Sequence, residues 1–357
     1  MGVPRIALVG GGTFGLMHLR AFRQFQHDGR CEFLALADVN ERLLEERARE
    51  FGMRAYADYR EMLERERPDA VAVATPDHLH REIALAALAQ GAHVFVEKPM
   101  DTTVEGCTAM IEAGRDAGVL LQVDFHKRYD PYHAELRRSA RQGKLGEIEY
   151  AYAWMEDRIE VPRSWLAAWA GESSPAWFLG IHMVDLVCWI TGCGGRRVHA
   201  TGVRKKLRSL GIDAWDSVCF SVEMDRDVTF QCQTSWVLPD AFEGIVNQGI
   251  RVVGTEGLME VDSQDRGARC CFAADGRMAT PNPGFFREGR DPCGRAVYGG
   301  YGIDAIRHFV DNVSFLMDGG ALSDLAGTYP SGEDGREATR IVAGVHDALQ
   351  RHAAVDL

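Results

Sequence analysis

The chain has 357 residues, of which 46% are hydrophobic and 26% are charged. This composition is typical of globular proteins, and the length suits two domains of roughly 100–200 residues each. The net charge of −12 disfavours a general binder of nucleic acids or anionic membranes, because those partners need a basic surface. With no membrane-span or signal-peptide pattern, we expect a cytoplasmic protein. We expect its nine cysteines to be reduced and mostly buried.

The first third of the chain alternates apolar runs with amphipathic patterns. The predicted strands are Arg5–Val9, Phe33–Ala37, Ala70–Ala74, Val94–Val96 and Leu120–Val123. The predicted helices are Leu16–Phe25, Glu41–Phe51, Tyr59–Glu66, Arg81–Gln90 and Val104–Ala117. The predicted cap residues are Asp58 and Thr103 before helices, and Gly52, Gly91 and Gly118 after them. Buried strands separated by helices indicate parallel β-α-β units.

The pattern changes near residue 125. The predicted strands are then Ile148–Trp154, Arg197–Val203, Ser217–Met224, Val228–Trp236, Ile250–Val253 and Leu258–Val261. The predicted helices are Pro131–Gln142, Phe178–Thr191, Ile303–Met317 and Glu333–Arg351. Turn residues such as Asp225–Asp227 indicate antiparallel hairpins, and residues 264–300 are expected to form a loop excursion. We therefore predict two domains, 1–124 and 125–357, without a flexible linker.

A glycine turn follows the first predicted strand. Gly10, Gly12 and Gly15 form a G-x-G-x-x-G pattern between a strand and a helix, the context that indicates dinucleotide binding. Gly10 permits the tight turn, Gly12 lets a pyrophosphate approach the backbone, and Gly15 lets helix and strand pack closely. The N–H groups at the start of the helix, around Thr13 and Phe14, are expected to face the phosphates.

Asp38 ends the second predicted strand, where a carboxylate binds the adenosine ribose. It would repel a 2′-phosphate, which favours NAD over NADP. Arg42, soon after Asn40, is the opposing feature, because an arginine there can receive a 2′-phosphate.

Two further strings end parallel strands. They are Ala74-Thr75-Pro76, followed by His80, and Glu97-Lys98-Pro99. Because the carboxyl ends of strands form the ligand crevice of such a sheet, we expect these residues to flank the cofactor. The predicted cofactor contacts at these strand ends are Thr75, Pro76, His80, Glu97 and Lys98.

Together with the glycine turn, these strings resemble the glucose–fructose oxidoreductase / inositol dehydrogenase / rhizopine-catabolism family (Gfo/Idh/MocA). The resemblance continues along nearly the whole chain, at Arg128, Pro131, residues 144–148, 180–185, Trp189, Gly192, 254–257 and 332–335. It implies an N-terminal Rossmann domain and a C-terminal α/β domain with a large, mostly antiparallel open sheet. It also implies hydride transfer between NAD(P) and a secondary alcohol or keto group of a sugar or polyol. Homodimers or homotetramers packed through that sheet are expected.

The resemblance assigns the acid–base role to Lys98, and a partly desolvated lysine at a strand end suits that chemistry. His182 and Asp185 share a helix face at i and i+3, and histidine suits proton transfer near neutral pH. We predict Lys98 and His182 as catalytic residues. The predicted substrate contacts are Asp185, Arg128, Arg163 and Trp165.

The chain departs from the family pattern at Phe178, where an aspartate is usual. Two other functions stay open: a glycoside hydrolase that oxidises its substrate transiently with NAD, and a non-catalytic cofactor sensor. The histidines of Asp77–His80, His126 and His133 lack metal-site spacing, so no metal site is expected.

Overall fold

The computed structural model describes residues 2–265, 267–272 and 276–357. Met1, where the first predicted domain begins, and residues 266 and 273–275 of the predicted loop excursion lie outside these ranges. The chain forms two compact units. Unit 1 holds the residues up to Tyr129 and Gly284–Arg336, and unit 2 holds Asp130–Pro283 and Glu337–Leu357. Among the described residues, no helix combines the length and apolarity needed to cross a membrane.

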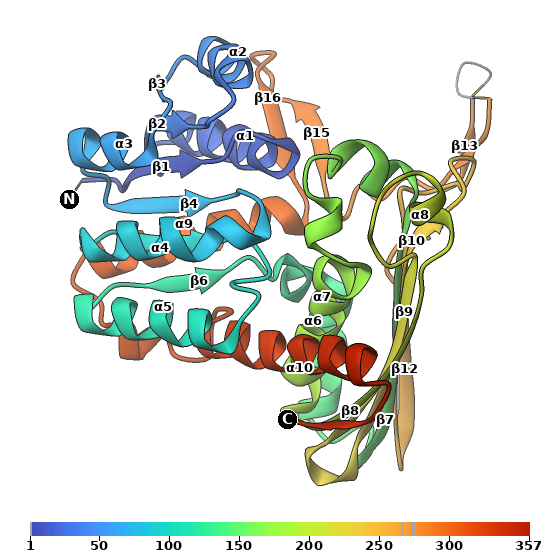
Figure 1. Ribbon diagram of the computed structural model, residues 1–357. Coiled ribbons are helices and arrows are strands. Elements are labelled where there is room, and N and C mark those ends of the chain that lie inside the picture. Colours follow the sequence, from blue (N-terminus) through green and yellow to red (C-terminus); the bar gives the residue numbers. More distant parts are fainter. Residues whose placement is uncertain (1, 266, 273–275) are drawn as a thin grey trace. The chain divides into compact units, whose positions relative to one another are not determined.

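Unit 1 is built on a six-stranded parallel sheet with the order β3-β2-β1-β4-β5-β6 (Figure 1). Its strands are β1 (Arg5–Val9), β2 (Glu32–Ala37), β3 (Arg54–Tyr56), β4 (Ala70–Val73), β5 (His93–Val96) and β6 (Leu121–Val123). This order is that of a Rossmann sheet and confirms the predicted parallel strands. Only β3 was not predicted; its first two residues are exposed, so it lacks an apolar run.

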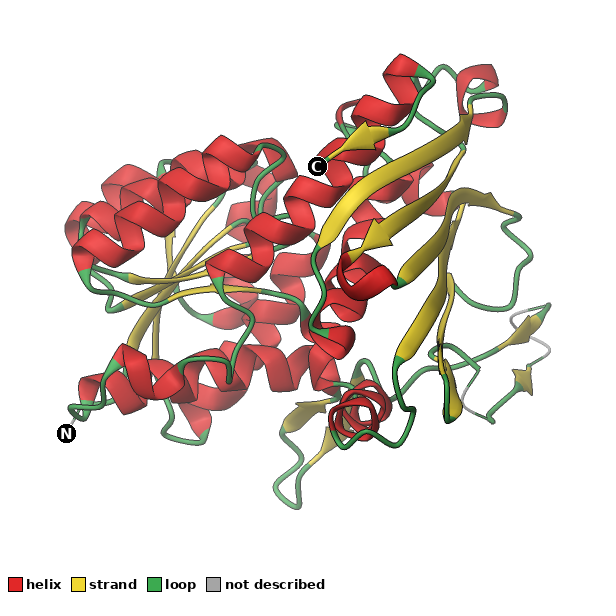
Figure 2. Ribbon diagram, turned by 90° about the horizontal axis from the view of Figure 1, so that it is seen from below, coloured by secondary structure: helices red, strands yellow, loops and turns green. Residues whose placement is uncertain are grey.

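Figure 2 shows helices on both faces of this sheet. Helix α1 packs against α9, and α4 packs against α5. The helices between the strands are α1 (Thr13–His27), α2 (Glu41–Phe51), α3 (Tyr59–Glu66), α4 (His80–Ala89) and α5 (Val104–Ala117). The predicted caps are confirmed: Asp58 and Thr103 accept hydrogen bonds from first-turn N–H groups. The glycines predicted to end helices have left-handed backbone at Gly52, Gly91 and Gly118.

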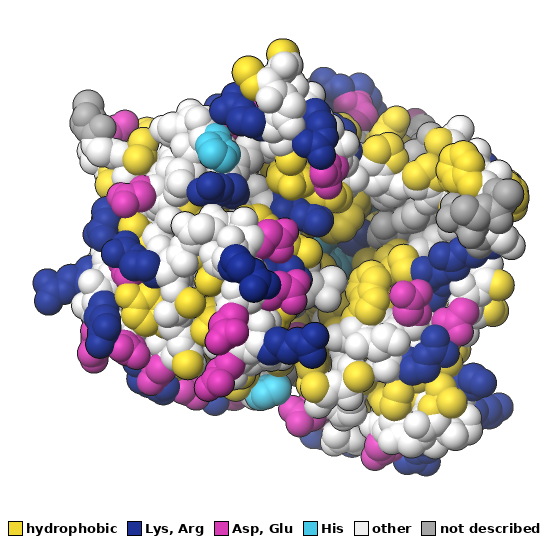
Figure 3. All heavy atoms as spheres, turned by 90° about the horizontal axis from the view of Figure 1, so that it is seen from above, with side chains coloured by type: hydrophobic (Ala, Val, Ile, Leu, Met, Phe, Trp, Pro, Cys, Tyr) yellow, Lys and Arg dark blue, Asp and Glu magenta, His cyan; other side chains and the backbone are white. Residues whose placement is uncertain are grey.

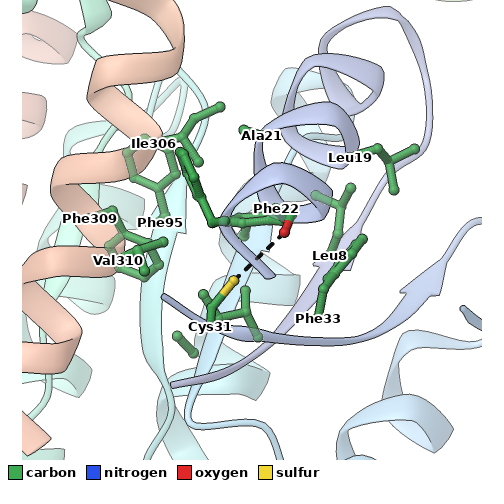
Figure 4. Close-up of a cluster of buried hydrophobic side chains, with 14 of the residues drawn as sticks. Leu8, Leu19, Ala21, Phe22, Cys31, Phe33, Phe95, Ile306, Phe309 and Val310 are labelled. Atoms are coloured by element: carbon green, nitrogen blue, oxygen red, sulfur yellow. Dashed lines mark hydrogen bonds between the residues drawn. The ribbon is translucent and has the colours of Figure 1, made fainter. Parts of the chain in front are cut away.

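A late segment of the chain completes unit 1. Helix α9 (Tyr301–Met317) follows a hairpin of β15 (Arg287–Arg290) and β16 (Ala296–Gly299). Figure 4 shows Ile306, Phe309 and Val310 of α9 in one core with side chains of the Rossmann sheet and α1. The ring of Phe309 stacks on that of Phe95, with 5.0 Å between centroids. Unit 1 thus differs from the predicted 1–124 domain: it extends to Tyr129 and takes in residues 284–336.

Unit 2 contains a seven-stranded sheet with the order β12-β11-β7-β10-β9-β8-β17. Its strands are β7 (Ile148–Arg158), β8 (Gly195–Val203), β9 (Ser217–Met224), β10 (Thr229–Leu238), β11 (Val246–Gly254), β12 (Gly257–Asp262) and β17 (Val355–Asp356). Every neighbouring pair is antiparallel except β7 and β10, which confirms the mostly antiparallel sheet. Residues Asp225–Asp227 form the predicted turn between β9 and β10.

Helices pack on the sheet of unit 2, and α6 also packs against α7. The helices are α6 (Pro131–Arg141), α7 (Ile181–Thr191) and α8 (Lys206–Ser209), and α10 (Gly332–Arg351) begins in unit 1 and ends in unit 2. Side chains alternate along β7: Ala151 and Ala153 are buried, while Tyr150 and Tyr152 are exposed. The predicted loop at 264–300 contains two short hairpins, the second being β15–β16 and the first formed by β13 (Cys270–Cys271) and β14 (Met278–Ala279).

The cysteines follow the burial prediction in part. Cys31, Cys107, Cys193 and Cys232 are buried, but Cys219, Cys271 and Cys293 are exposed, so the prediction is wrong for these three. Burial raises the pKa of Cys31 to about 12, and its Sγ faces the carbonyl oxygen of Phe22 (Figure 4).

On the face shown in Figure 3, acidic side chains lie among the basic ones. This arrangement differs from the continuous basic surface of a nucleic-acid binder.

Candidate active site

The glycine turn between β1 and α1 has the shape that a dinucleotide needs. A Cβ on Gly10 would lie 2.2 Å from the carbonyl oxygen of Ala74, and one on Gly15 would lie 2.1 Å from that of Gly10. Both positions therefore require glycine for packing. A Cβ on Gly12, in contrast, would meet nothing within 4 Å, and Gly12 and Thr13 are exposed. The backbone at Gly12 is thus open to a ligand.

The start of α1 is suited to binding an anion. Its N-cap residue, Gly12, has no side chain that could cap the helix, so a phosphate could take the place that a capping side chain would occupy at this helix start. Nearby, the methyl group of Thr75 would lie 3.1 Å from a Cβ on Gly10. The Thr75 hydroxyl is buried and has no hydrogen-bond partner among the described residues. These features fit a bound dinucleotide.

Asp38 lies directly beside the glycine turn. Its Oδ2 accepts a hydrogen bond from Gly11 N–H at 2.7 Å, and its Oδ1 accepts one from Asn40 N–H at 2.8 Å. The carboxylate is therefore fixed by the backbone at the end of β2. The Asn40 side chain caps α2 through the N–H of Leu43, while Arg42 is exposed on the first turn of that helix.

The ends of β4 and β5 are joined by His80. One ring nitrogen lies 2.7 Å from the Pro99 carbonyl oxygen and the other 2.8 Å from that of Thr75. Since the ring is fully buried, these contacts make His80 a link between the two strand ends. Thr75 and Pro76 are half-buried at the same edge of the sheet.

Lys98 directly follows Glu97 at the end of β5 and is only 4% exposed. Its ammonium nitrogen lies 5.7 Å from the centroid of the Phe14 ring, in the first turn of α1. The predicted cofactor contacts from three separate segments, the glycine turn and the ends of β4 and β5, thus come together in unit 1.

Glu97 belongs to a buried cluster that was not predicted from the sequence. Nε2 of His18, on α1, lies 3.0 Å from Oε1 of Glu97 and 4.0 Å from Oδ2 of Asp124. Among the described residues, these three side chains form the one group whose atoms are close enough to share a metal ion. Asp124 follows β6 directly, so its place at a strand end was a usable signal; the inward direction of His18 was not visible in the sequence.

Unit 2 carries the second predicted catalytic residue. His182 and Asp185 lie on α7, one turn apart, and are 3% and 2% exposed. The helix follows a π-helical segment, Ala176–Gly180, that includes Phe178. The Phe178 ring is edge-on to those of Trp169 and Trp236. An aromatic side chain thus occupies the position at which the family pattern has an acid.

The predicted substrate contacts are distributed over both units. In unit 1, Arg128 is 8% exposed and pairs with Asp334 at 3.0 Å. In unit 2, Arg163 makes two hydrogen bonds of 3.1 Å to Asp240, and Trp165 is 40% exposed. Both arginines are therefore already held by carboxylates.

Comparison with known proteins connects these features to a family. Residues 4–125 match the family described as an oxidoreductase family with an NAD-binding Rossmann fold, and residues 133–260 match the GFO/IDH/MocA C-terminal domain. The chain is 25% identical to levoglucosan dehydrogenase of Pseudarthrobacter phenanthrenivorans, over 99% of this chain and 97% of that protein. It is 29% identical to D-glucoside 3-dehydrogenase of Escherichia coli, over 61% of this chain and 64% of that protein.

The fold is also similar to that of scyllo-inositol dehydrogenase from Lactobacillus casei, solved with NAD(H) and scyllo-inositol. The TM-score is 0.77 over 99% of both chains, at 17% identity, so this likeness concerns the fold alone. The matches to both domains, together with the glycine turn, Asp38 and the Glu97-Lys98-Pro99 string, show that the chain belongs to the GFO/IDH/MocA family of oxidoreductases with an NAD-binding Rossmann fold.

Proposed function

We propose that this protein transfers hydride between NAD(P), preferentially NAD, and a secondary alcohol or keto group of a sugar, polyol or sugar derivative. The names of its relatives support this substrate class, since they are dehydrogenases of levoglucosan and of D-glucosides. The preference for NAD is supported by the carboxylate of Asp38, which would repel a 2′-phosphate.

The observation that carries the proposal is the position of Lys98. It is a buried lysine at a strand end, 5.7 Å from the ring of a residue in the cofactor-binding turn. Bound NAD supplies the redox chemistry, by accepting or donating hydride. Oxidation of a secondary alcohol also requires removal of its hydroxyl proton. An amine at this place can take that proton, and the ammonium can return it in the reverse direction.

His182 is the second acid–base group in this proposal. It is buried on α7, and Asp185 on the next turn of the same helix face can orient its ring or bind a substrate hydroxyl. We retain Asp185, Arg128, Arg163 and Trp165 as proposed substrate contacts. Because Arg128 and Arg163 already pair with Asp334 and Asp240, an anionic substrate group would have to compete with these carboxylates.

We further propose that two or four copies of the chain associate through the sheet of unit 2. Support comes from the outward side chains of Tyr150, Tyr152 and Leu258, which are 41%, 39% and 63% exposed on that sheet. Large exposed apolar side chains on a sheet often mark an interface. Light scattering on the wild type and on Tyr152→Asp tests the proposal: the variant should have a lower mass, and a monomeric wild type would refute it.

The function is tested by following absorbance of the reduced nicotinamide with NAD, then NADP, across inositols, hexoses, aminosugars, 1,6-anhydrosugars and glycosides. We expect a substrate-dependent increase with NAD. Each negative result is then followed by oxidation of NADH with the matching keto compounds. Release of free sugar from a glycoside without net change in the nicotinamide would instead indicate a hydrolase. Cofactor binding without turnover on any substrate would indicate a sensor.

A further inference from the structure

The cluster of His18, Glu97 and Asp124 adjoins the proposed acid–base residue, because Glu97 directly precedes Lys98 in the chain. His18 and Asp124 are fully buried and Glu97 is 5% exposed. One atom of each side chain lies within 4.8 Å of one atom of each of the others. Two carboxyl groups therefore lie close together in a place from which water is excluded.

The ionisable side chains in and beside this cluster come from three segments of unit 1. His18 comes from α1, Glu97 and Lys98 follow β5, and Asp124 follows β6. The turn after Asp124 adds His126 and Lys127, both buried. Nδ1 of His126 lies 3.8 Å from Oδ1 of Asp124. Burial, together with the charge of Lys127, lowers the pKa of His126 to about 3, so this ring is neutral near pH 7 and does not offset a carboxylate.

The two carboxyl groups are not equivalent. Burial acts to raise the pKa of Glu97, but the hydrogen bond from His18 and the charge of Lys98 outweigh it, so that the net pKa is lowered. Burial and the neighbouring charge of Glu97 raise the pKa of Asp124. When two carboxyl groups share a site, one keeps its proton because both charges together cost too much.

The hydrogen bonds also indicate that Asp124, not Glu97, is the carboxyl group that keeps its proton. Neither oxygen of Asp124 accepts a hydrogen bond from any donor among the described residues. An ionised carboxylate buried in this way would be costly. The hydrogen-bonding neighbour of Asp124 is Glu97, itself an acceptor, so a hydrogen bond between the two needs a proton.

We propose that Asp124 is a positioning residue: at neutral pH it keeps its proton and donates it to the carboxylate of Glu97. Together with the hydrogen bond from His18, this bond then holds Glu97 by two partners. Glu97 is the residue before Lys98, so the hydrogen bond fixes the turn that presents the ammonium group beside Phe14. The link to catalysis rests on the proposed role of Lys98, but the protonation of Asp124 does not.

Carbon-13 NMR of protein labelled at the aspartate carboxyl carbons tests the protonation without turnover. The Asp124 signal is assigned by its loss in Asp124→Asn. We expect the chemical shift of a neutral acid, unchanged from about pH 6 to about pH 8, well above the ordinary range of aspartate. Asp334 provides an ionised reference, because Arg128 and Ser331 outweigh burial and lower its pKa. A carboxylate shift for Asp124 at pH 7 would overturn the proposal.

Two substitutions of similar size test the positioning role. Asp124→Asn keeps a donor toward Glu97, whereas Asp124→Leu removes it. We expect the asparagine variant to keep the wild-type pH profile of kcat/KM. In the leucine variant the hydrogen bond to the carboxylate of Glu97 is lost. A hydrogen bond to a charged group corresponds to roughly one to two pKa units, so the acid limb of the kcat/KM profile should move to higher pH by about one unit.

The outcomes separate this proposal from the proposed function. Equal profiles for both variants would exclude a positioning role through the donated proton, whatever the role of Lys98. Full activity of a Lys98 variant would refute the acid–base assignment and leave the NMR result intact. Metal analysis covers the remaining case: one equivalent of zinc or manganese in the purified wild type, lost in Asp124→Asn, would overturn the shared proton in favour of a cation.

Discussion

The ammonium nitrogen of Lys98 lies 5.7 Å from the centroid of the Phe14 ring. The two residues are far apart in the sequence, one at the end of β5 and the other in the first turn of α1, yet they meet at the same edge of the Rossmann sheet. Unit 1 therefore brings the proposed acid–base group and the cofactor-binding turn together by itself. We therefore expect substitutions within this one unit to separate cofactor binding from the proton transfer that we propose for Lys98.

Lys98→Met should abolish most turnover and leave cofactor binding nearly intact. Methionine fills similar space but has no group that can accept or donate a proton. The value of kcat should therefore fall by about 10²–10⁴-fold, the usual contribution of a general acid–base group. Steady-state kinetics and calorimetric titration with NAD measure the two effects. The matched control is Lys144→Met, at an exposed lysine, which should match the wild type. Near-normal turnover of the Lys98 variant would remove this residue from the mechanism.

The glycines of the turn should separate binding from folding. Gly12→Ala adds a methyl group where no described atom lies within 4 Å, so the melting temperature should stay near the wild-type value. The same methyl group would obstruct the approach of the pyrophosphate, and the Kd for NAD should rise by at least about tenfold.

Gly15→Ala is the contrasting variant. Its Cβ would lie 2.1 Å from the carbonyl oxygen of Gly10, so it should lower both stability and NAD affinity. Thermal unfolding with and without NAD distinguishes the two variants. If Gly12→Ala binds NAD as tightly as the wild type, the pyrophosphate does not approach this part of the turn.

Asp38→Asn should narrow the preference for NAD over NADP by roughly tenfold, because it removes the charge that repels a 2′-phosphate and weakens the bond to the ribose. The asparagine oxygen can still accept the hydrogen bond from Gly11, although its NH2 group cannot accept the one from Asn40 N–H, so the contact to the glycine turn should be kept. Asp38→Ala, which removes that acceptor too, should also lower stability. The test is to measure the Kd values for NAD and NADP in the wild type and in both variants. Unchanged values in both variants would exclude Asp38 from the cofactor site.

The Rossmann sheet was predictable because each of its longer strands is a continuous apolar run bounded by turn residues. Four helices carry matching caps, as at Asp58 and Thr103. The position of α9 was not predictable in the same way. Its apolar face, with Ile306 and Phe309, is compatible with any sheet, and only the folded chain shows that it packs against Phe95 of β5.

The candidate site was predictable where one short string held the residues. The glycine turn and Glu97-Lys98-Pro99 are such strings, and the strand-end rule placed them at the same edge. His18 was not visible because its side chain points inward only through the packing of α1 against the sheet. The parallel pairing of β7 with β10 was not predicted for a similar reason. Turn residues indicate only which consecutive strands form a hairpin, whereas the pairing of strands distant in sequence depends on the topology of the whole sheet.

His182→Ala should lower kcat by about 10²-fold or more, the lower range for an acid–base group, with a smaller change in NAD affinity. The pH profile should also lose the limb that the imidazole contributes. His199→Ala is the matched control, because its side chain is 51% exposed on β8 and should not affect turnover. A His182 variant with the wild-type rate and pH profile would leave this buried histidine a structural role only.

The ion pair between Arg128 and Asp334 should make the stability of unit 1 depend on pH. Burial raises the pKa of Asp334, but the charge and hydrogen bond of Arg128 and the bonds from Ser331 outweigh this, and the net pKa is lowered. A carboxyl group with a lowered pKa in the folded state stabilises the fold above its unfolded pKa, and this contribution is lost as pH falls through the folded value. Asp334→Asn should therefore lower the melting temperature at pH 7, by an amount corresponding to about 1 kcal/mol, because the side chain of Asp334 is 36% exposed and solvent weakens the pair. The difference from the wild type should shrink as the pH falls below about 4. A constant difference across this range would show that the charge of Asp334 is not what holds Arg128.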